Sequence, residues 1–430
     1  MVGNPAPEAL SGRPSPKYLR LLLLLLLPAA LFNSYDSELR AVLLKQLASS
    51  FHVHSTTSLG LANIPIGAGQ YVAFFAVLYA DRIGRRPLLL WSILGYTVFT
   101  TLSAAAWSLW SFAAFQAGAQ IFIGAEYGVA ITLLAEEVPA EHRGRYLSYL
   151  LLLSPLGAVL GGGLLAAGFL HNPIGWRAFF LIALIPLVVV TVARRHLRES
   201  HAWLTSTDAR GGVPRRSARQ LAVDSSTVWR GPQRSRVLAV GAISFVQLLV
   251  TAAAVGWWVW YAEHERHFST GTAGTFFALA ALMSVGGYLT CGPVMDRIGR
   301  RWTATLYIVA AVTCAVVTFQ VANRWWMLPF LVGTAFFGLG MAPVLSAFAA
   351  ELFPTAVRAQ ASGWIRNAWG TTGSVVGPTM VGVLGAAAGP LHDIGDAMTV
   401  TALLLLVAVP IIWAMIPETR GVSLDETDIE

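Results

Sequence analysis

Runs of apolar residues, separated by short polar or charged stretches, recur along nearly the whole chain. Each run holds about 20 mostly apolar residues, a length that crosses about 30 Å of hydrocarbon as a helix. The pattern therefore predicts an all-α membrane protein with twelve transmembrane helices. The expected spans are 19–45, 58–79, 88–107, 111–134, 146–169, 177–197, 236–261, 272–294, 302–321, 326–350, 360–385 and 396–416.

Composition agrees with a chain that is solvated by a lipid bilayer. Hydrophobic residues make up 56% of the chain and charged residues only 12%, far from the balance of a soluble globular protein. Several tryptophans fall near the ends of the expected spans, where an interfacial belt is typical. They are Trp257, Trp258, Trp260, Trp325 and Trp326.

The positive charges predict the orientation of the chain. Of the 29 lysines and arginines, 23 lie on the same side as the N-terminus, in the terminal segments, in alternate connections or at the span ends next to them. Because cytoplasmic loops carry the excess of Lys and Arg, we expect both termini on the cytoplasmic side of a cell membrane such as the bacterial inner membrane. The net charge of +7 then reflects topology and does not indicate a nucleic-acid partner.

A charged motif occurs twice at a constant offset. Asp81–Arg86 reads D-R-I-G-R-R and recurs as Asp296–Arg301, 215 positions later (296 − 81 = 215). The same offset relates a second set, in which Glu136, Pro139 and Arg143 recur as Glu351, Pro354 and Arg358. The repeat predicts two pseudo-symmetric six-helix bundles, 1–197 and 236–430, joined by a cytoplasmic linker, 198–235.

On these residues the chain resembles the major facilitator superfamily, whose loop between helices two and three carries G-x-x-x-D-R-x-G-R-R. The leading Gly is matched by Gly292 in the second half, whereas Val77 stands there in the first. Tyr35-Asp36 is similar to the first-helix motifs of sugar porters and of aromatic-acid:proton symporters. Arg198-Glu199-Ser200 and Pro417–Gly421 look like the signatures after helices six and twelve that metabolite:proton symporters share.

The duplicated charges indicate a conformational latch. An Asp in each loop can accept hydrogen bonds from Arg side chains and cap the helix that follows, so it holds two cytoplasmic helix ends together. Such contacts must break when the halves rock apart. The alternative is that the arginines only enforce topology, which leaves the paired Asp unexplained. The expected latch residues are Asp81, Arg82, Arg85, Arg86, Glu136, Arg143, Asp296, Arg297, Arg300, Arg301, Glu351 and Arg358.

Ionisable residues inside the spans are few, and each is costly unless it faces a cavity or a partner. The first span holds Asp36, Glu38 and Arg40, and the fourth holds Glu126. Asp36 and Arg40 are four residues apart and can pair on one helix face. The resemblance makes Asp36 the proton-coupling carboxylate. Glu126 is a second proton-coupling candidate, and its alternative role is a hydrogen bond between helices.

The substrate-binding candidates follow from position and from the resemblance. The Arg that sugar porters pair with this Asp falls on Gln116. Two alternatives follow: Arg40 substitutes as the partner, or Asp36 is protonated at rest and works with Glu126. Arg366 lies about 12 Å deeper than Arg358 along the eleventh span, where its guanidinium suits a carboxylate or an aromatic solute; its alternative is a pair with a helix carbonyl. The full candidate set is Tyr35, Arg40, Gln116, Trp364, Arg366, Asn367 and Trp369.

Glycine spacing and absent motifs complete the prediction. Gly157-x-x-x-Gly161 and Gly373-x-x-x-Gly377 predict close helix packing. The sequence holds no P-loop, G-x-S-x-G or H-E-x-x-H, and none of its nine His lies deep in a span, so we expect no enzyme activity, metal or cofactor.

We therefore expect a monomeric secondary active transporter that moves a small organic solute, such as an organic acid, together with protons by alternating access. The alternatives are a proton-driven exporter of drugs or metabolites and a membrane sensor that does not transport.

Overall fold

The computed structural model describes residues 16–78, 85–138, 140–182, 184–185, 227–229 and 233–420. Every element with assigned bounds in these ranges is helical. The first group comprises α1 (Pro16–Val42), α2 (Leu44–Ser50), α3 (Thr56–Leu61), α4 (Asn63–Leu78), α6 (Arg85–Ala104), α7 (Leu109–Glu137), α8 (Ala140–Ala166), η2 (Phe169–His171) and α9 (Arg177–Leu181), and η3 (Thr227–Trp229) follows it. The second group comprises α13 (Arg234–His264), α14 (Thr270–Ile298), α15 (Arg300–Gln320), α16 (Arg324–Gly340), α17 (Ala342–Glu351), α18 (Thr355–Gly363), η4 (Trp364–Gly370), α19 (Thr371–Leu384), α20 (Ile394–Leu403), η5 (Leu404–Val407) and α21 (Ala408–Met415).

Eight of the expected spans are confirmed as helices long and apolar enough to cross a membrane within the described residues. They are Tyr18–Val42, Arg86–Ala104, Leu109–Leu134, Arg234–His264, Thr270–Ile298, Arg300–Gln320, Arg324–Glu351 and Ile394–Met415. These helices fall on the expected spans to within a few residues at each end, because a run of apolar side chains and the end of a membrane helix are set by the same hydrocarbon thickness.

The other four spans are not among these eight. The second is divided between α3 and α4, and the fifth corresponds to the long helix α8. The sixth begins with α9, and its remainder lies almost entirely outside the described residues. The eleventh is built from α18, a π-helical turn η4 and α19. A π-helical turn inside a helix is uncommon and is frequent at functional sites.

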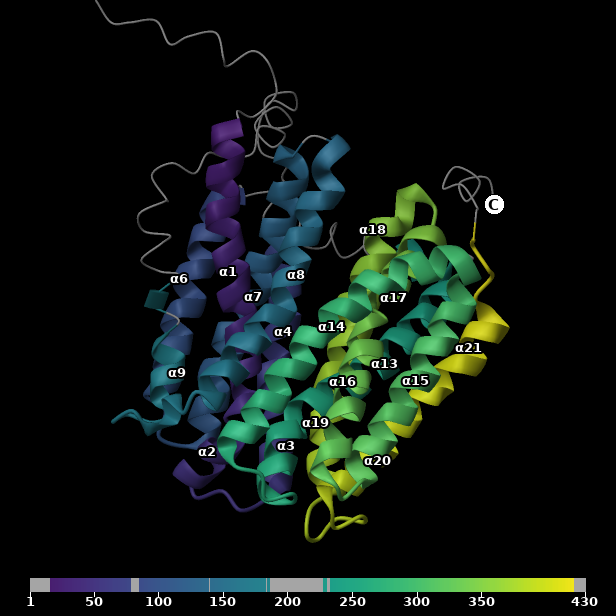
Figure 1. Ribbon diagram of the computed structural model, residues 1–430. Helices are drawn as coiled ribbons and strands as arrows, with labels where there is room; N and C mark the ends of the chain where they lie inside the picture. The colour runs from purple at the N-terminus through teal and green to yellow at the C-terminus, as the bar shows by residue number, and fades with distance from the viewer. Residues whose placement is uncertain are drawn as a thin grey trace, which may run out of the picture.

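The two groups of helices stand side by side and lean against each other (Figure 1). Contacts between them run from α8 to α14, from α1 to α13, and from α3 and α4 to α19. The groups converge at the end of the molecule that holds α2, α3 and α20, here the α2 end, and diverge toward the end near the C-terminus, here the terminus end (Figure 1).

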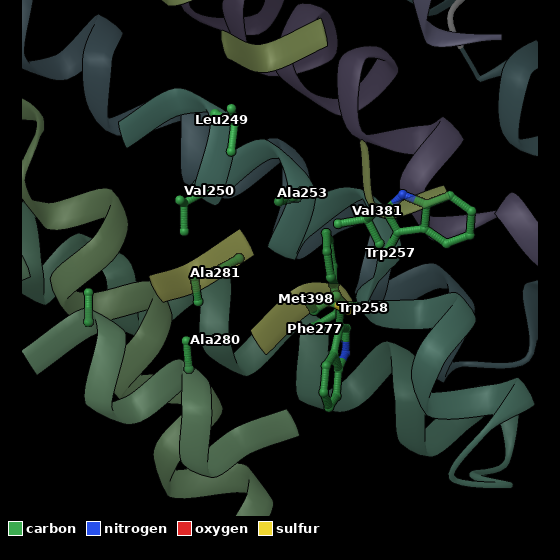
Figure 2. Packing of buried hydrophobic residues seen from close by; sticks show 14 of the residues in the cluster. Leu249, Val250, Ala253, Trp257, Trp258, Phe277, Ala280, Ala281, Val381 and Met398 are labelled. Carbon is green, nitrogen blue, oxygen red and sulfur yellow. The ribbon is translucent and has the colours of Figure 1, made fainter. Parts of the chain in front are cut away.

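The core is centred on α13, which packs against α14, α19 and α20 (Figure 2). Trp257, Trp258 and Trp260 are all buried, so the expectation that they form an interfacial belt is wrong. The Trp257 indole donates to the Pro378 carbonyl oxygen at 2.8 Å, which supplies the partner that a buried indole N–H needs. By contrast, Trp325 and Trp326 are exposed, as expected of a belt at a span end.

Close helix packing depends on glycines at several crossings. A Cβ atom at Gly373 would lie 2.2 Å from the Phe245 carbonyl oxygen, and one at Gly377 would lie 2.0 Å from that of Leu249. Gly157 packs equally closely on the backbone of α1, whereas Gly161 has more room. Three of the four predicted glycines therefore lie at positions where any side chain would force helices apart.

Candidate functional site

Two connected cavities lie where the groups of helices meet. The polar cavity, of about 820 Å³, is lined by Ser37, Glu38, Arg40, Ala41, Asn63, Ile66, Gly67, Gln70, Leu248, Thr251, Ala252, Val255, Gly256, Leu339, Ser374 and Val375. The apolar cavity, of about 1070 Å³, is lined mainly by α13 to α16 and also by Glu38, Pro155 and Ala158. Both cavities share Glu38, Thr251, Val255 and Leu339, so they are neighbouring parts of one central space.

Arg40 is held at the wall of the polar cavity by a side chain of α4. Its guanidinium donates to Asn63 Oδ1. The amide nitrogen of Asn63 in turn donates to the Gly60 carbonyl oxygen at 2.7 Å, which orients Oδ1 toward Arg40. About two turns further along α4, Gln70 donates to Gln120 Oε1 of α7 at 3.2 Å. Arg40 therefore presents a fixed positive charge to the cavity, with amide side chains beside it.

The intramembrane carboxylates Asp36 and Glu126 lie behind this wall, within the first group of helices. Each is only 1% exposed. Asp36 Oδ2 accepts from the Thr100 hydroxyl of α6 at 2.7 Å, and Glu126 Oε2 accepts from Asn33 Nδ2 at 2.6 Å. These residues, with Tyr96, form what we term the buried carboxylate site, defined by Asn33, Asp36, Tyr96, Thr100 and Glu126.

Each acidic or phenolic group of the buried carboxylate site keeps one atom without a hydrogen-bond partner among the described residues. These atoms are Asp36 Oδ1, Glu126 Oε1 and the Tyr96 hydroxyl. Tyr96 lies near enough to both carboxylates to interact with them electrostatically. Because an ionised carboxylate inside a bundle is costly, a site with two of them and no basic side chain bonded to either is suited to holding protons.

The expected pairing of Asp36 with Arg40 is corrected by these contacts. Asp36 is bonded to α6, whereas Arg40 is bonded to α4. Although the two residues share one face by sequence spacing, each finds a nearer partner on a different neighbouring helix. Asp36 therefore belongs to the interior of the first group and Arg40 to the cavity.

Two other predicted substrate residues do not reach the central space. Tyr35 is buried, and its hydroxyl donates to the Phe179 carbonyl oxygen at 3.0 Å. Gln116 is also buried and donates to Ser103 Oγ at 3.1 Å. Neither lines the polar or the apolar cavity.

Arg366 bridges the two groups of helices. It lies in the π-helical turn η4, is exposed, and donates to the Tyr127 hydroxyl of α7 at 3.4 Å. Its guanidinium also lies 5.4 Å from the centre of the Tyr127 ring, a cation–π contact. Tyr288, which lines the apolar cavity, is within electrostatic reach of both residues. Arg366 is thus close to the cavity wall.

The neighbours of Arg366 in η4 have packing roles. The ring of Trp364 meets that of Trp229 at 5.4 Å. Trp369 covers Gly241 of α13, where a Cβ atom would approach the indole to 2.7 Å. Asn367 is partly buried and does not line either cavity.

The second copy of the charged motif forms a network at the terminus end. Arg300 Nη2 and Glu351 Oε1 are 2.9 Å apart, which joins the start of α15 to the end of α17. Glu351 also accepts from the Thr419 hydroxyl. The network holds two helix ends together, but the partners just named all belong to the second half.

The cap of α15 differs from the expectation. Asp296 is largely exposed and pairs with Arg300 at 3.6 Å, but it does not cap the helix. Glu418 does so: its carboxylate accepts from the backbone N–H groups of Arg300 at 2.8 Å and Arg301 at 3.1 Å. A carboxylate is favoured there by the free N–H groups and by the helix dipole. The predicted Asp296 cap is therefore wrong.

The remaining latch candidates are placed only in part. Arg301 donates to the Trp413 carbonyl oxygen at 2.5 Å, and Arg358 donates to that of Phe353 at 3.1 Å, while Arg297 is exposed. Asp81 and Arg82 lie outside the described residues, as do the side chains of Arg85, Glu136 and Arg143. Arg86 begins the span Arg86–Ala104.

The α2 end carries contacts between the halves. Lys45 Nζ lies 3.5 Å from Glu263 Oε2, and Gln46 donates to the same oxygen at 3.4 Å. Thr379 of α19 donates to the Gly60 carbonyl oxygen of α3 at 3.0 Å. These contacts join the two halves at the α2 end.

Sequence reasoning left three cavity residues out of the candidate site. Glu38 was visible as a charge in the first span, two residues from Asp36, and its helix face alone did not assign it to a cavity. Asn63 and Gln70 are polar residues in an apolar run, a weak signal on its own.

Comparison with known proteins agrees with the fold and with the motifs. Residues 26–378 and 241–428 match the sequence model of the Major Facilitator Superfamily. The chain is 31% identical over 355 residues to a putative metabolite transport protein of Haemophilus influenzae, covering 80% of this chain and 83% of the relative. It is 28% identical over 401 residues to a probable 4-methylmuconolactone transporter of Cupriavidus pinatubonensis, covering 91% and 89%.

Solved structures show the same fold at lower sequence identity. A bacterial homologue of the human lysosomal transporter Spinster superposes with a TM-score of 0.76 at 15% identity, covering 97% of this chain and 98% of the other. A D-xylose-proton symporter superposes with a TM-score of 0.75 at 18% identity, covering 95% and 99%. With its duplicated motif, paired groups of helices and central space, this chain belongs to the Major Facilitator Superfamily.

Proposed function

We propose that the protein is a secondary active transporter that carries an organic acid together with protons. The observation that carries this proposal is the division of charge on α1: Arg40 lines the central cavity, whereas Asp36 is buried behind the cavity wall with Glu126 nearby in the same group of helices. One helix thus joins a cation suited to a substrate carboxylate to a site suited to protons.

The relatives support this substrate class. Those matched over most of this chain include proteins named as a gallate transporter of Pseudomonas putida, a cis,cis-muconate transport protein of Acinetobacter baylyi and a gentisate transporter of Corynebacterium glutamicum. All three names are those of organic-acid anions. The fold relative named as a D-xylose-proton symporter is consistent with proton coupling.

In the proposed cycle, protons neutralise both carboxylates of the buried carboxylate site, Asp36 and Glu126, and the substrate carboxylate binds at Arg40. The neutral site lets α1 move with its bundle, because no bare charge has to change its surroundings in the membrane. The halves, which we place at 1–197 and 236–430 with a linker at 198–235, then rock about the central space. With both termini in the cytoplasm, the closed α2 end faces outward and the present state is inward-facing.

The latch expected from the sequence holds the cytoplasmic helix ends together and breaks when the halves rock apart. The contacts found in the second half favour a role within one bundle. Arg300 and Glu351 join α15 to α17, so this copy of the network stiffens the cytoplasmic end of one bundle. Rocking as a rigid body requires that stiffness, because a deformable bundle would not carry a motion at the cavity to the far end.

Purified protein in liposomes with an imposed pH gradient tests the proposal. A panel of sugars, aliphatic carboxylates and aromatic acids is supplied outside, where the pH is lower. We expect an organic acid to accumulate inside, and a protonophore to abolish the accumulation. Accumulation of the solute inside only when the lower pH is also inside would instead identify a proton-driven exporter. Accumulation of sugars but not of acids would contradict the assigned substrate class.

A further inference from the structure

Glu38 is a second charge on the wall of the central space, and the proposed organic-acid function does not use it. It lines both the polar and the apolar cavity. No described side chain lies within hydrogen-bonding or ion-pairing distance of its carboxylate, whereas Asp36 and Glu126 are each bonded to a neighbouring helix. A charge that faces a cavity inside a membrane protein without a protein partner is suited to a ligand.

The placement of Glu38 relative to Arg40 defines what kind of ligand fits. The two residues are close enough to interact electrostatically, yet they form no ion pair within 4.0 Å. Residues two positions apart on a helix do not face each other, so the two charges are kept apart instead of neutralising each other. Asn63 further holds the guanidinium toward α4.

We propose that the central cavity binds a zwitterion, with the carboxylate of the substrate at Arg40 and a positively charged or basic nitrogen at Glu38. This inference rests on the proposed organic-acid function and narrows it to acids that also carry a basic nitrogen, such as pyridine carboxylates and amino acids with a substituted nitrogen.

The surroundings of Glu38 favour a compact cationic group. Glu38 also lines the apolar cavity, where Trp258, Phe277 and Tyr288 contribute aromatic surface. Aromatic rings attract a cation beside a carboxylate, and they tolerate methyl groups on a nitrogen better than a hydrated polar wall does. Among the described residues that line the polar cavity, Arg40 is the one cation. It is therefore the partner available to the carboxylate of the same ligand.

Two pairs of ligands with matched shapes test the inference. 1-Methylpyridinium-3-carboxylate and 3-methylbenzoate differ by one ring atom and one positive charge. Trimethylglycine and 3,3-dimethylbutanoate differ in the same way without a ring. Binding to the purified protein in lipid nanodiscs is measured by calorimetry. We expect the zwitterion to bind at least about tenfold more tightly than its matched anion in at least one pair.

Variants assign that preference to Glu38. Glu38→Gln should remove the preference by weakening zwitterion binding, and Glu38→Asp, which keeps the charge, should retain part of it. Glu265→Gln, the same change outside the cavity, should leave the ratio of affinities as it is in the unaltered protein. Thermal unfolding of each variant checks that it is folded. The comparison of each zwitterion with its matched anion is made in the unaltered protein and does not depend on any variant.

Three results would overturn the inference. Equal or weaker binding of both zwitterions to the unaltered protein contradicts it and leaves the organic-acid proposal standing. A preference that survives in Glu38→Gln contradicts the role of Glu38. If no member of either pair binds, the zwitterion site is rejected, while accumulation of other acids in the liposome assay still decides the proposed function separately.

Discussion

Gly287 and Gly292 lie about one and a half turns apart on α14 but in opposite surroundings. A Cβ atom at Gly287 would lie 1.9 Å from the Phe336 carbonyl oxygen, whereas one at Gly292 would have nothing within 4 Å. Gly292 is the leading glycine of the duplicated motif, and its open surroundings leave room for a side chain at this position of the second half.

These surroundings predict opposite effects of the same substitution. Gly287→Ala should lower the free energy of unfolding by about 2 kcal/mol or more, because α14 and α16 must separate. Gly292→Ala should raise it by up to about 1 kcal/mol, since alanine is the better helix former. Thermal unfolding in detergent measures both. Equal destabilisation by the two variants would contradict the contacts described for α14.

At the residue scale, the sequence predicted which side chains are unusual better than it predicted what they touch. Asp36, Glu126 and Arg366 stood out because charges are rare in the spans. The partners Thr100, Asn33 and Tyr127 could not be predicted, because each lies on another helix and its contact depends on how that helix is rotated. Glu38 shows the same limit: its value as a candidate depends on the cavity it faces.

At the scale of the elements, the start of α20 is capped by a titratable side chain, that of Glu265. The Glu265 carboxylate accepts from the backbone N–H groups of Ile394 at 2.8 Å and Gly395 at 3.1 Å. Burial raises the pKa of Glu265 above its ordinary value of 4.5, although these two hydrogen bonds oppose the rise. The folded protein therefore holds this proton more tightly than the unfolded chain does.

The sign of the pH dependence follows from that difference. From pH 4.5 up to the raised pKa, the folded state binds more protons at Glu265, so the contribution of this group to stability falls as pH rises. Glu265→Gln does not titrate. Its unfolding temperature, measured relative to the unaltered protein, should therefore rise as the pH increases from 4.5 to the raised pKa. A constant difference, or one that changes in the opposite direction, would show that the Glu265 proton is not bound more tightly in the folded state.

Hydropathy predicted the long elements because span length and apolar composition have the same cause. It did not predict the break in the eleventh span, where α18, η4 and α19 follow one another. A window of apolar residues reports composition and is insensitive to the hydrogen-bond register of the backbone. Arg366 and its aromatic neighbours Trp364 and Trp369 occupy this turn.

At the scale of the whole molecule, the α2 end joins the halves through a partly buried ion pair. Glu263 is fully buried at its side chain and Lys45 is 41% exposed. Such a pair contributes at most about 1 kcal/mol. Glu263→Gln should therefore increase the population that is open at this end by a few-fold.

Chemical labelling can measure that shift. A cysteine introduced as Thr379→Cys, in a background without Cys291 and Cys314, reports opening of the contact with Gly60. Labelling should be faster with Glu263→Gln and unchanged with Glu265→Gln. If labelling is equally fast in all three proteins, the ion pair does not help to close the α2 end.

The repeat at a fixed offset predicted the architecture of the whole molecule, because duplicated loops imply duplicated bundles. It could not predict the central site, since Asp36, Glu38, Arg40 and Glu126 have no charged counterparts at that offset. The charged loop motifs are therefore repeated in the two halves, whereas the charges of the proposed proton and substrate sites occur only in the first half.

The division of α1 into a proton side and a substrate side is the central claim, and one comparison tests it most directly. In liposomes, gradient-driven accumulation and exchange between equal pools of substrate are measured for Asp36→Asn and for Arg40→Gln. The account predicts that Asp36→Asn loses accumulation but still exchanges substrate, while Arg40→Gln loses both. If Asp36→Asn accumulates substrate as well as the unaltered protein does, or if Arg40→Gln exchanges normally, the account is contradicted.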